Sequence, residues 1–353
     1  MPRAARAALM TFADQWDHRG VRAWHEGWWE VGRTTGDLLT SILGAAPGSI
    51  TMHQNVTVAQ SVVASCFSFE GPRRRIVLQD LDFPTNHYLF EGFRRYGAEI
   101  VVVPSDDRMR APIERMVAAI DERTVLVPIS LVLFRSGCVQ DVKPVIDRAH
   151  AVGAHVVLDI YQGAGTVPID LTALNVDFAV GGSVKWLCGG PGAGYLYVRP
   201  DLIPVMRPSV VGWAGHTAPF GFETGAIVYA DGIERFQSGT PNVPALAAAS
   251  AGYHIVSEIG VPAIREKSLR LTRRMLTFAQ ARGWRINTPL GDSERGGSVV
   301  IDIPDGARIA DALIKRNVIV DYRPGAGIRL APHFYNTDEE VDAAMSTLAE
   351  LVG

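Results

Sequence analysis

The stretch VVLDIYQGAGTVPIDLTALNVDFAVGGSVKWLCGGPGAGYLYV, residues 156–198, decides the fold of this chain. One short apolar run, Val156–Leu158, ends in Asp159, and a second, Phe178–Val180, leads through glycines to Lys185. Runs of this length and composition are typical of buried parallel strands, and open α/β sheets bind their ligands at the carboxyl ends of such strands. We therefore expect Asp159 and Lys185 at the functional edge of an α/β sheet.

The same pattern extends along the chain, where short apolar strands alternate with amphipathic helices. Strands are predicted at Arg75–Gln79, Ile100–Val103, Val125–Ile129, Val156–Asp159 and Phe178–Val180. Helices are predicted between them at Thr85–Tyr96, Pro112–Ile120 and Val142–Val152. This alternation indicates βαβ units and a mainly parallel sheet that is covered by helices on both faces.

After Gly239 the pattern changes to that of a smaller α+β domain. Its predicted elements are helices at Ala263–Arg282, Ala307–Arg316 and Asp338–Leu351, and strands at Ser298–Ile303, Val318–Asp321 and Gly327–Leu330. We expect a large domain in residues 1–245, which includes a tryptophan-rich N-terminal segment, and a small C-terminal domain in residues 246–353.

Composition excludes several classes of protein. The chain has 353 residues, of which 47% are hydrophobic, and a net charge of −3 with scattered basic residues, which argues against a nucleic-acid-binding surface. Its apolar runs are too short to span a bilayer, and none reads as a signal peptide. Three cysteines, Cys66, Cys138 and Cys188, do not form a disulfide framework. We expect a soluble, cytoplasmic protein.

Two charged residues in the quoted stretch are candidates for chemistry. A buried carboxylate at Asp159 needs a positive partner or hydrogen bonds, which a protonated pyridine nitrogen, a helix cap or a metal ion would each provide. Lys185 follows an apolar strand and precedes the glycine-rich 189–194, and apolar neighbours lower the pKa of a lysine, which suits Schiff-base chemistry. A surface lysine is the alternative for Lys185.

A third candidate is a helix start at Asn55-Val56-Thr57, with the helix running to Ser68. The free N–H groups and the dipole at the beginning of a helix bind phosphate. Taken alone, Thr57 is equally well explained as an ordinary helix N-terminal residue. The order of a phosphate-type helix start, an aspartate and then a lysine is the layout of fold-type-I pyridoxal-phosphate enzymes.

With these residues in place, the chain resembles the class V aminotransferases, and within them it is similar to kynureninases over nearly its whole length. The segments that carry the resemblance are FPTNHY at 83–88, DIYQGAGTVPID at 159–170, GWAGH at 212–216, SGTP at 238–241 and IRLAPHFYN at 328–336. The resemblance implies the fold-type-I architecture, with a seven-stranded sheet in the large domain, and pyridoxal 5'-phosphate as cofactor.

The resemblance also implies roles for individual residues. Lys185 would bind the cofactor covalently and move the substrate proton, Asp159 would keep the pyridine nitrogen protonated, and Phe83 would stack on the ring. Arg329 would bind the substrate carboxylate by a bidentate pair. The remaining implied cofactor contacts are Val56, Thr57, Thr85, Asn86, Gln162 and Ser183, together with Trp213 and Thr240 from the second subunit of a homodimer. His216 and Tyr88 are candidate substrate contacts.

The sequence departs from the kynureninase pattern at three positions near the cofactor. Val184 replaces the tyrosine that usually precedes the lysine, Gln162 replaces a histidine, and Asn86 replaces an acid. Cysteine desulfurases need a nucleophilic cysteine just before the carboxylate-binding arginine, and the stretch 321–327 has none. The spacing of His25, His53, His87 and His216 fits no zinc pattern, so no metal is expected.

These observations predict an enzyme that acts on an α-amino acid. Hydrolysis between Cβ and Cγ, as in kynureninases, is the reaction that the resemblance favours. Transamination and β-elimination stay open because of Val184 and Gln162. A binding protein that keeps the fold without catalysis would have lost the cofactor residues, whereas Lys185, Asp159 and Arg329 are all present. An oxidoreductase is disfavoured because the Gly-x-Gly-x-x-Gly turn is missing.

Overall fold

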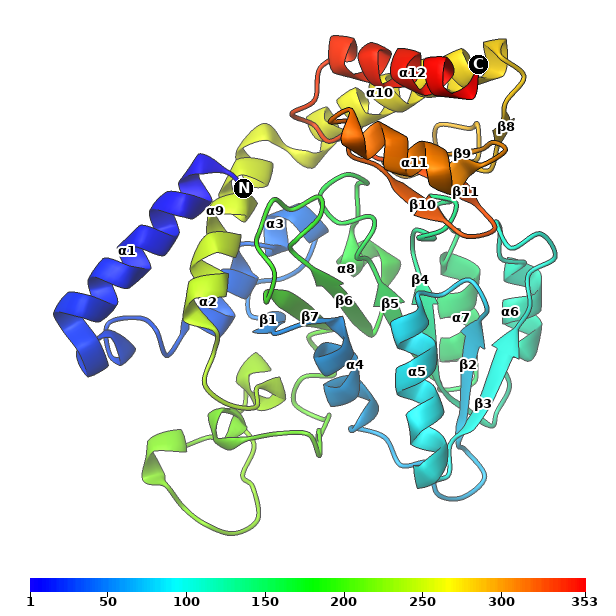
Figure 1. Ribbon diagram of the computed structural model, residues 1–353. Helices are drawn as coiled ribbons and strands as arrows, with labels where there is room; N and C mark the ends of the chain where they lie inside the picture. Colours follow the sequence, from blue (N-terminus) through cyan, green and yellow to red (C-terminus); the bar gives the residue numbers. More distant parts are fainter.

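A seven-stranded sheet forms the centre of the computed structural model, which describes residues 1–353, in the order β1-β7-β6-β5-β4-β2-β3 (Figure 1). The strands are β1 Ile50–His53, β2 Arg75–Gln79, β3 Glu99–Val103, β4 Thr124–Ser130, β5 His155–Asp159, β6 Phe178–Gly182 and β7 Gly194–Val198. Only β7 runs antiparallel to its neighbours. The predicted α/β class with a mainly parallel seven-stranded sheet is therefore confirmed.

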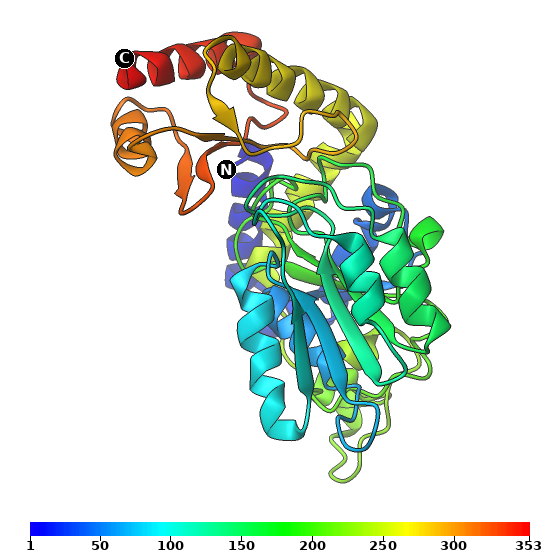
Figure 2. The same ribbon diagram turned by 90° about the vertical axis from the view of Figure 1, so that its right-hand side faces the viewer.

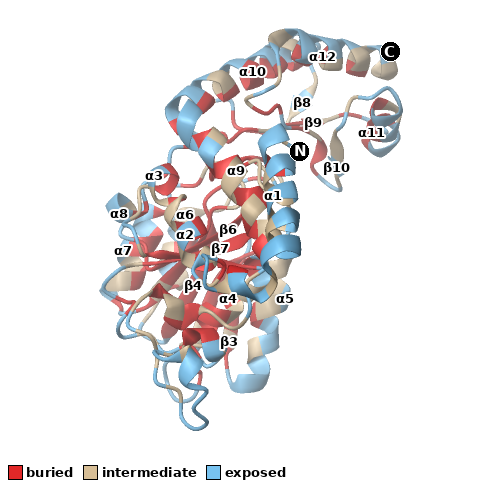
Figure 3. Ribbon diagram, turned by 90° about the vertical axis from the view of Figure 1, so that its left-hand side faces the viewer, coloured by how far each residue is buried: buried red, intermediate tan, exposed pale blue.

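Helices cover both faces of this sheet, because successive strand residues point to opposite sides. In β5, Val156 and Leu158 face one core and Val157 faces the other. The first core is covered by α6 (Ile113–Ala119), α7 (Lys143–Ala151) and α9 (Val243–Ile259), and the second by α4 (Val56–Ala64) and α5 (Pro84–Gly92). Buried residues accordingly concentrate along the strands and the inner helix faces (Figure 3).

The N-terminal segment packs on the large domain. It comprises α1 Arg3–Arg19, the 3-10 helix η1 Gly20–Trp24, α2 Val31–Asp37 and α3 Thr40–Leu43. Helix α1 lies along α9, and Trp28 is buried against Phe12, Trp24 and Val243 (Figure 1). Trp24 and Trp28 thus contribute to packing, whereas Trp16 is exposed.

The C-terminal part forms a second, antiparallel sheet of four strands, in the order β10-β11-β9-β8. These strands are β8 Arg285–Ile286, β9 Val299–Asp302, β10 Asp321–Arg323 and β11 Gly327–Leu330, and the helices are α10 Val261–Ala281, α11 Gly306–Lys315 and α12 Asp338–Val352. Helix α12 begins with a capping box between Thr337 and Glu340. Figure 2 shows this part above one end of the large sheet.

Helix α10 contributes to a hydrophobic core of the large sheet and to the core of the small sheet. Its residues Val261 and Ile264 belong to the core of the large sheet, whereas Leu271 and Met275 belong to that of the small sheet. Residue 246, where we placed the boundary from the sequence, lies inside α9. A continuous pair of long helices therefore connects the two sheets without a linker.

Most predicted elements lie within one or two residues of those observed. Helix α9 was not predicted, and the helix expected at Thr85–Tyr96 is α-helical only to Gly92 and continues as a 3-10 helix to Tyr96. Three further differences concern a helix end and two strands. The helix that begins at Val56 ends at Ala64 instead of Ser68, and the strand predicted at Val318–Asp321 lies at Asp321–Arg323. Strand β1 was not predicted, because Ile50–His53 is short and ends in a polar residue. None of the helices combines the length and apolar character that a membrane crossing requires.

Candidate active site

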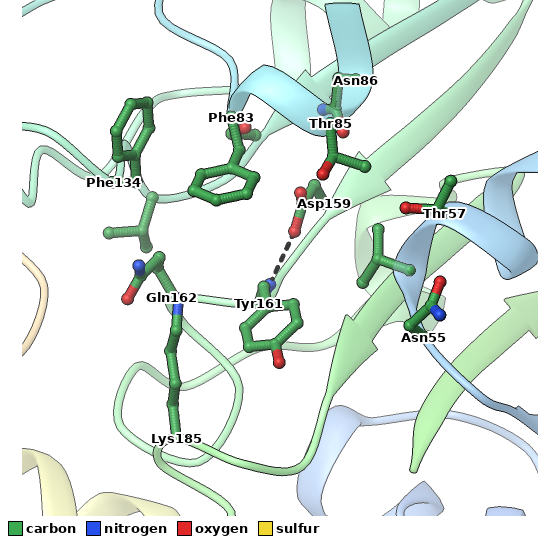
Figure 4. A pocket seen from close by; sticks show the side chains of 13 residues that line it. Asn55, Thr57, Phe83, Thr85, Asn86, Phe134, Asp159, Tyr161, Gln162 and Lys185 are labelled. Atoms are coloured by element: carbon green, nitrogen blue, oxygen red, sulfur yellow. Dashed lines mark hydrogen bonds between the residues drawn. The ribbon is translucent and has the colours of Figure 1, made fainter. Parts of the chain in front are cut away.

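A cavity of about 250 Å³ opens where β4 and β5 end (Figure 4). Ser130 and Asp159 are the last residues of these strands and are paired in register, so both side chains reach the same edge of the sheet. Lys185 enters from the turn after β6. The residues around the cavity are Asn55, Val56, Thr57, Phe83, Thr85, Asn86, Ser130, Val132, Phe134, Asp159, Tyr161, Gln162 and Lys185.

Asp159 is a buried carboxylate with few partners. Its Oδ1 accepts a hydrogen bond of 2.9 Å from the backbone N–H of Tyr161. Burial raises the pKa of Asp159 from 3.8 to about 6, and Asp82 adds to the rise, whereas the Tyr161 N–H and Lys185 oppose it. A cationic N–H donor in the cavity would pair with this carboxylate and reverse the effect.

A second buried carboxylate, Asp82, lies next to the site but is fully hydrogen-bonded. Its Oδ1 accepts from Ser130 N (3.0 Å), Ser130 Oγ (2.7 Å) and Gln79 Nε2 (3.1 Å), and its Oδ2 accepts from Gln79 N (3.2 Å). Burial raises the pKa of Asp82 to about 6, and these hydrogen bonds oppose the rise. Asp82 therefore ties β2 to β4 directly before Phe83.

Lys185 is a half-buried amine inside the cavity. Burial lowers the pKa of Lys185 from 10.5 to about 8, and the Arg329 guanidinium adds to this, whereas Asp159 opposes it. The Nζ atom lies 4.4 Å from the centre of the Tyr161 ring. An amine with a lowered pKa supplies the unprotonated form that attacks carbonyl groups near neutral pH.

Two helices point their N-termini toward the cavity. Helix α4 begins after Asn55, whose side chain caps it by accepting from Val58 N at 3.0 Å, which leaves the N–H groups of Val56 and Thr57 near the cavity. A Cβ at Gly194 would lie 2.8 Å from the backbone of Asn55, so only glycine in β7 allows this approach. The arrangement is that of an anion site.

Helix α5 supplies the aromatic wall and an amide. Phe83 precedes its first residue and meets Phe134 edge to face, with ring centres 5.2 Å apart. Asn86 is fully buried in the first turn of α5, and neither atom of its amide has a hydrogen-bond partner. A buried amide without partners is costly unless a ligand satisfies it.

Arg329 lies beside the cavity and not in its wall. It is paired in register with Asp321 across β10 and β11, and its Nε and Nη2 donate to that carboxylate at 3.1 and 2.6 Å. Its Nη1 donates to the carbonyl of Phe134 at 2.8 Å, and Arg323 also binds Asp321. The guanidinium is thus held at the junction of the two sheets, next to a residue of the cavity wall.

The single chain brings together eight of the predicted site residues, namely Val56, Thr57, Phe83, Thr85, Asn86, Asp159, Gln162 and Lys185. Ser183 is turned inward, where its hydroxyl donates to the carbonyl of Ala193 and contacts the hydroxyl of Tyr253. Thr240 lines a separate hollow with His53. Trp213, His216 and Tyr88 do not line the cavity, and Tyr88 is 78% exposed.

Sequence reasoning missed several residues of the site. Ser130 directly follows the strand predicted at Val125–Ile129. A polar residue at the carboxyl end of a strand is a signal that would have identified Ser130 as a site residue. Tyr161 lies within the quoted stretch, two residues after Asp159. Phe134 and Val132 belong to a plain apolar run and carry no signal in the sequence. Cys188, which is near Lys185 in sequence, has its pKa raised to about 11 by burial, which disfavours the thiolate form that acts as a nucleophile.

The sequence of this chain is similar to a known protein family and to several of its members. The sequence model of the aminotransferase class-V family matches residues 17–343. Kynureninase from Bacillus thuringiensis subsp. konkukian is 31% identical over 369 residues, which cover 100% of this chain and 86% of that protein. The uncharacterized aminotransferase YcbU of Bacillus subtilis is 33% identical over 308 residues, or 87% of this chain and 80% of that protein.

Solved structures share the fold. The cystine C-S lyase C-DES, solved in complex with its reaction product cysteine persulfide, superposes with a TM-score of 0.87 at 20% sequence identity. The match covers 99% of this chain and 94% of that one. At this identity the likeness shows that the fold is shared.

Proposed function

Because this chain belongs to the aminotransferase class-V family, a family of pyridoxal-phosphate enzymes, we propose that it hydrolyses the Cβ–Cγ bond of a kynurenine-like α-amino acid. The observation that carries the proposal is the meeting of Lys185 Nζ, the Asp159 carboxylate and the N-terminus of α4 in one cavity. The kynureninases that match over the whole chain favour hydrolysis among the reactions of the family.

The residues of the cavity fit pyridoxal phosphate. Asp159 is a buried carboxylate that lacks a cationic partner, and a pyridine N–H would be one. Asn86 has an amide without partners that faces the same space. Lys185 would hold the cofactor covalently, Phe83 would cover its ring, and the N–H groups of Val56 and Thr57 would bind its phosphate.

When bound, the cofactor supplies an electron sink for the substrate α-carbon. Asp159 would hold a proton at the ring nitrogen, because a carboxylate in this buried position gains most from an ionic hydrogen bond. Lys185 Nζ, once freed by the substrate amine, would take the proton from the α-carbon. Arg329, held in place by Asp321, would orient the substrate carboxylate.

Transamination is the second candidate, and two observations favour it. One relative of 33% identity is called an aminotransferase, although an uncharacterized one. In addition, Val184 and Gln162 differ from the residues that kynureninases usually carry at these positions. Transamination would use the proton transfers by Lys185 and a water that releases the oxo acid, and it would leave the Cβ–Cγ bond intact.

We also propose that the protein is a homodimer with shared active sites. Trp213, Phe220 and Phe222 form an exposed aromatic patch with Trp29, with ring centres 4.7 to 6.3 Å apart. Phe222 is 73% exposed, and a patch of this kind is unusual on a monomer. A second copy covering it would bring Trp213 and Thr240 to the partner's phosphate site.

The test is incubation of the purified protein, loaded with cofactor, with L-kynurenine and separately with L-alanine. Release of anthranilate and alanine from kynurenine, abolished in Lys185→Ala, would support hydrolysis. Conversion of the bound cofactor to its pyridoxamine form, with no anthranilate, would establish transamination instead. A protein that binds no cofactor, judged by its visible absorption, would refute the role of Lys185 altogether.

A further inference from the structure

Tyr161 occupies a position in the cavity that the proposed mechanism does not use. It follows Asp159 by two residues, is half-buried, and extends its ring into the cavity beside Lys185 (Figure 4). Its ring centre lies 4.4 Å from Lys185 Nζ, which is within the range of a cation–π contact. Tyr161 thus presents a ring face to the reactive amine.

The backbone makes room for this ring at Gly182, the last residue of β6. A Cβ at that position would lie 2.6 Å from Cε2 of Tyr161 and 2.7 Å from its hydroxyl oxygen. Any other residue would therefore push the ring away from its place. The observed position of the ring therefore depends on the missing side chain at Gly182.

The ring is a close partner of the Lys185 ammonium, which forms no hydrogen bond or salt bridge with a side chain. Of the charged groups around it, Asp159 and Asp321 favour the charged form, whereas Arg329 and Arg323 disfavour it. Neither carboxylate forms a salt bridge with Nζ. The Tyr161 ring is therefore the contact that can hold the end of the lysine side chain in place.

We infer that Tyr161 is a positioning residue whose ring face holds the protonated Lys185 at the edge of the cavity. Contact with the ring favours the ammonium over the amine, because the ring quadrupole attracts a cation. When the lysine gives up its proton, the attraction is lost and Nζ is released toward the cavity. The meaning of this step for catalysis rests on the proposed function, whereas the contact itself does not.

A passive role for Tyr161 predicts the opposite sign. A ring that only fills space keeps water from the amine and so lowers the pKa of Lys185, as burial does. Truncating such a ring would raise the pKa. Truncating a ring that holds the ammonium would lower it, since the loss of the cation–π contact outweighs the gain in hydration.

The experiment is competitive acetylation of the cofactor-free, full-length protein over a range of pH, read by mass spectrometry. The chain has only four lysines, so Lys143, Lys267 and Lys315 serve as internal standards. The pH at the midpoint of the curve of acetylation rate against pH reports the protonation of Lys185. The plateau of the curve at high pH reports how accessible Lys185 is to the reagent. Wild type is compared with Tyr161→Phe, which keeps the ring, and Tyr161→Leu, which removes it.

We expect the midpoint for Lys185 to fall in Tyr161→Leu, so that the unprotonated fraction below the midpoint rises roughly two- to tenfold. In Tyr161→Phe it should stay within about twofold of wild type, because the ring is kept. Tyr96→Leu is the matched control, since Tyr96 is exposed and its ring faces Arg95 far from the site. A midpoint that rises or does not move in Tyr161→Leu would overturn the inference.

A second variant guards against a folding defect in Tyr161→Leu. Gly182→Ala leaves Tyr161 in the chain but displaces its ring, so it should move the midpoint in the same direction. An unmoved midpoint in a folded Gly182→Ala protein would contradict the inference. Failure of the proposed function would show differently, as intact wild-type labelling with no turnover of kynurenine.

Discussion

Replacing Asp159 by Asn should stabilise the cofactor-free protein at neutral pH, although it removes a residue of the site. Burial raises the pKa of Asp159 from 3.8 to about 6. Each unit of pKa corresponds to about 1.4 kcal/mol, so ionised Asp159 costs the folded chain about 3 kcal/mol at pH 7.5. An uncharged Asn avoids this cost and loses about 1 kcal/mol for its poorly satisfied amide.

The net gain should therefore be about 2 kcal/mol at pH 7.5 and should depend on pH. The folded-state pKa is raised, so the stability associated with Asp159 is complete below pH 3.8 and is lost as the pH rises through about 6. Near pH 4.5 the acid is already protonated in the folded wild type, and the gain of Asp159→Asn should vanish. The assay is urea unfolding of both proteins at the two pH values.

Asp82→Asn is the control, because Asp82 has a similar pKa of about 6 but accepts four hydrogen bonds. An Asn there would turn an N–H donor toward other donors, so at both pH values we expect Asp82→Asn to be about 1 to 3 kcal/mol less favourable than Asp159→Asn. The reasoning would be refuted by an Asp159→Asn protein no more stable than wild type at pH 7.5. A gain of equal size at pH 4.5 would refute it as well.

Three further predictions concern the surroundings of the cavity. Gly194→Ala should cost about 1 to 3 kcal/mol in unfolding free energy, because its Cβ meets the Asn55 backbone; an unchanged urea midpoint would contradict this. Arg329→Met should raise KM for kynurenine roughly ten- to a hundredfold with a smaller change in kcat, measured by steady-state kinetics; an equal KM would remove Arg329 from substrate binding. Phe222→Glu should halve the mass seen by sedimentation velocity without lowering Tm, and a mass equal to that of wild type would place the subunit contact elsewhere.

The fold of the large domain was predictable because most strands of its sheet can be identified from their own residues. Buried strands such as β2 and β5 are uninterrupted apolar runs, and β2 was predicted with its observed bounds. Strand β1 could not be found in this way, since its four residues include Thr51 and His53, which are buried through pairing with β7. Its position depends on a partner almost 150 residues later in the chain.

The candidate site was predictable where its residues end strands or begin helices. Asp159 and Thr57 occupy such positions, so their type and place suggested chemistry. The pairing of Arg329 with Asp321 was not foreseen, because it follows from the register of β10 and β11 and not from spacing along the chain. The same holds for Phe134, which reaches the cavity only because the segment after β4 folds back over the sheet edge.

The cavity collects groups that are each unfavourable without a ligand. Asp159 lacks a cationic partner, and Asn86 has an amide without hydrogen bonds. Lys185 has a lowered pKa, so burial disfavours its charged form. A ligand that binds only the folded chain and satisfies these groups adds to stability by mass action. The free energy that Asp159 costs the cofactor-free protein is thus the same free energy that a pyridine N–H would recover on binding. A site of this kind couples the stability of the chain to its cofactor, which is why the replacement that stabilises the cofactor-free protein must also weaken its hold on the cofactor.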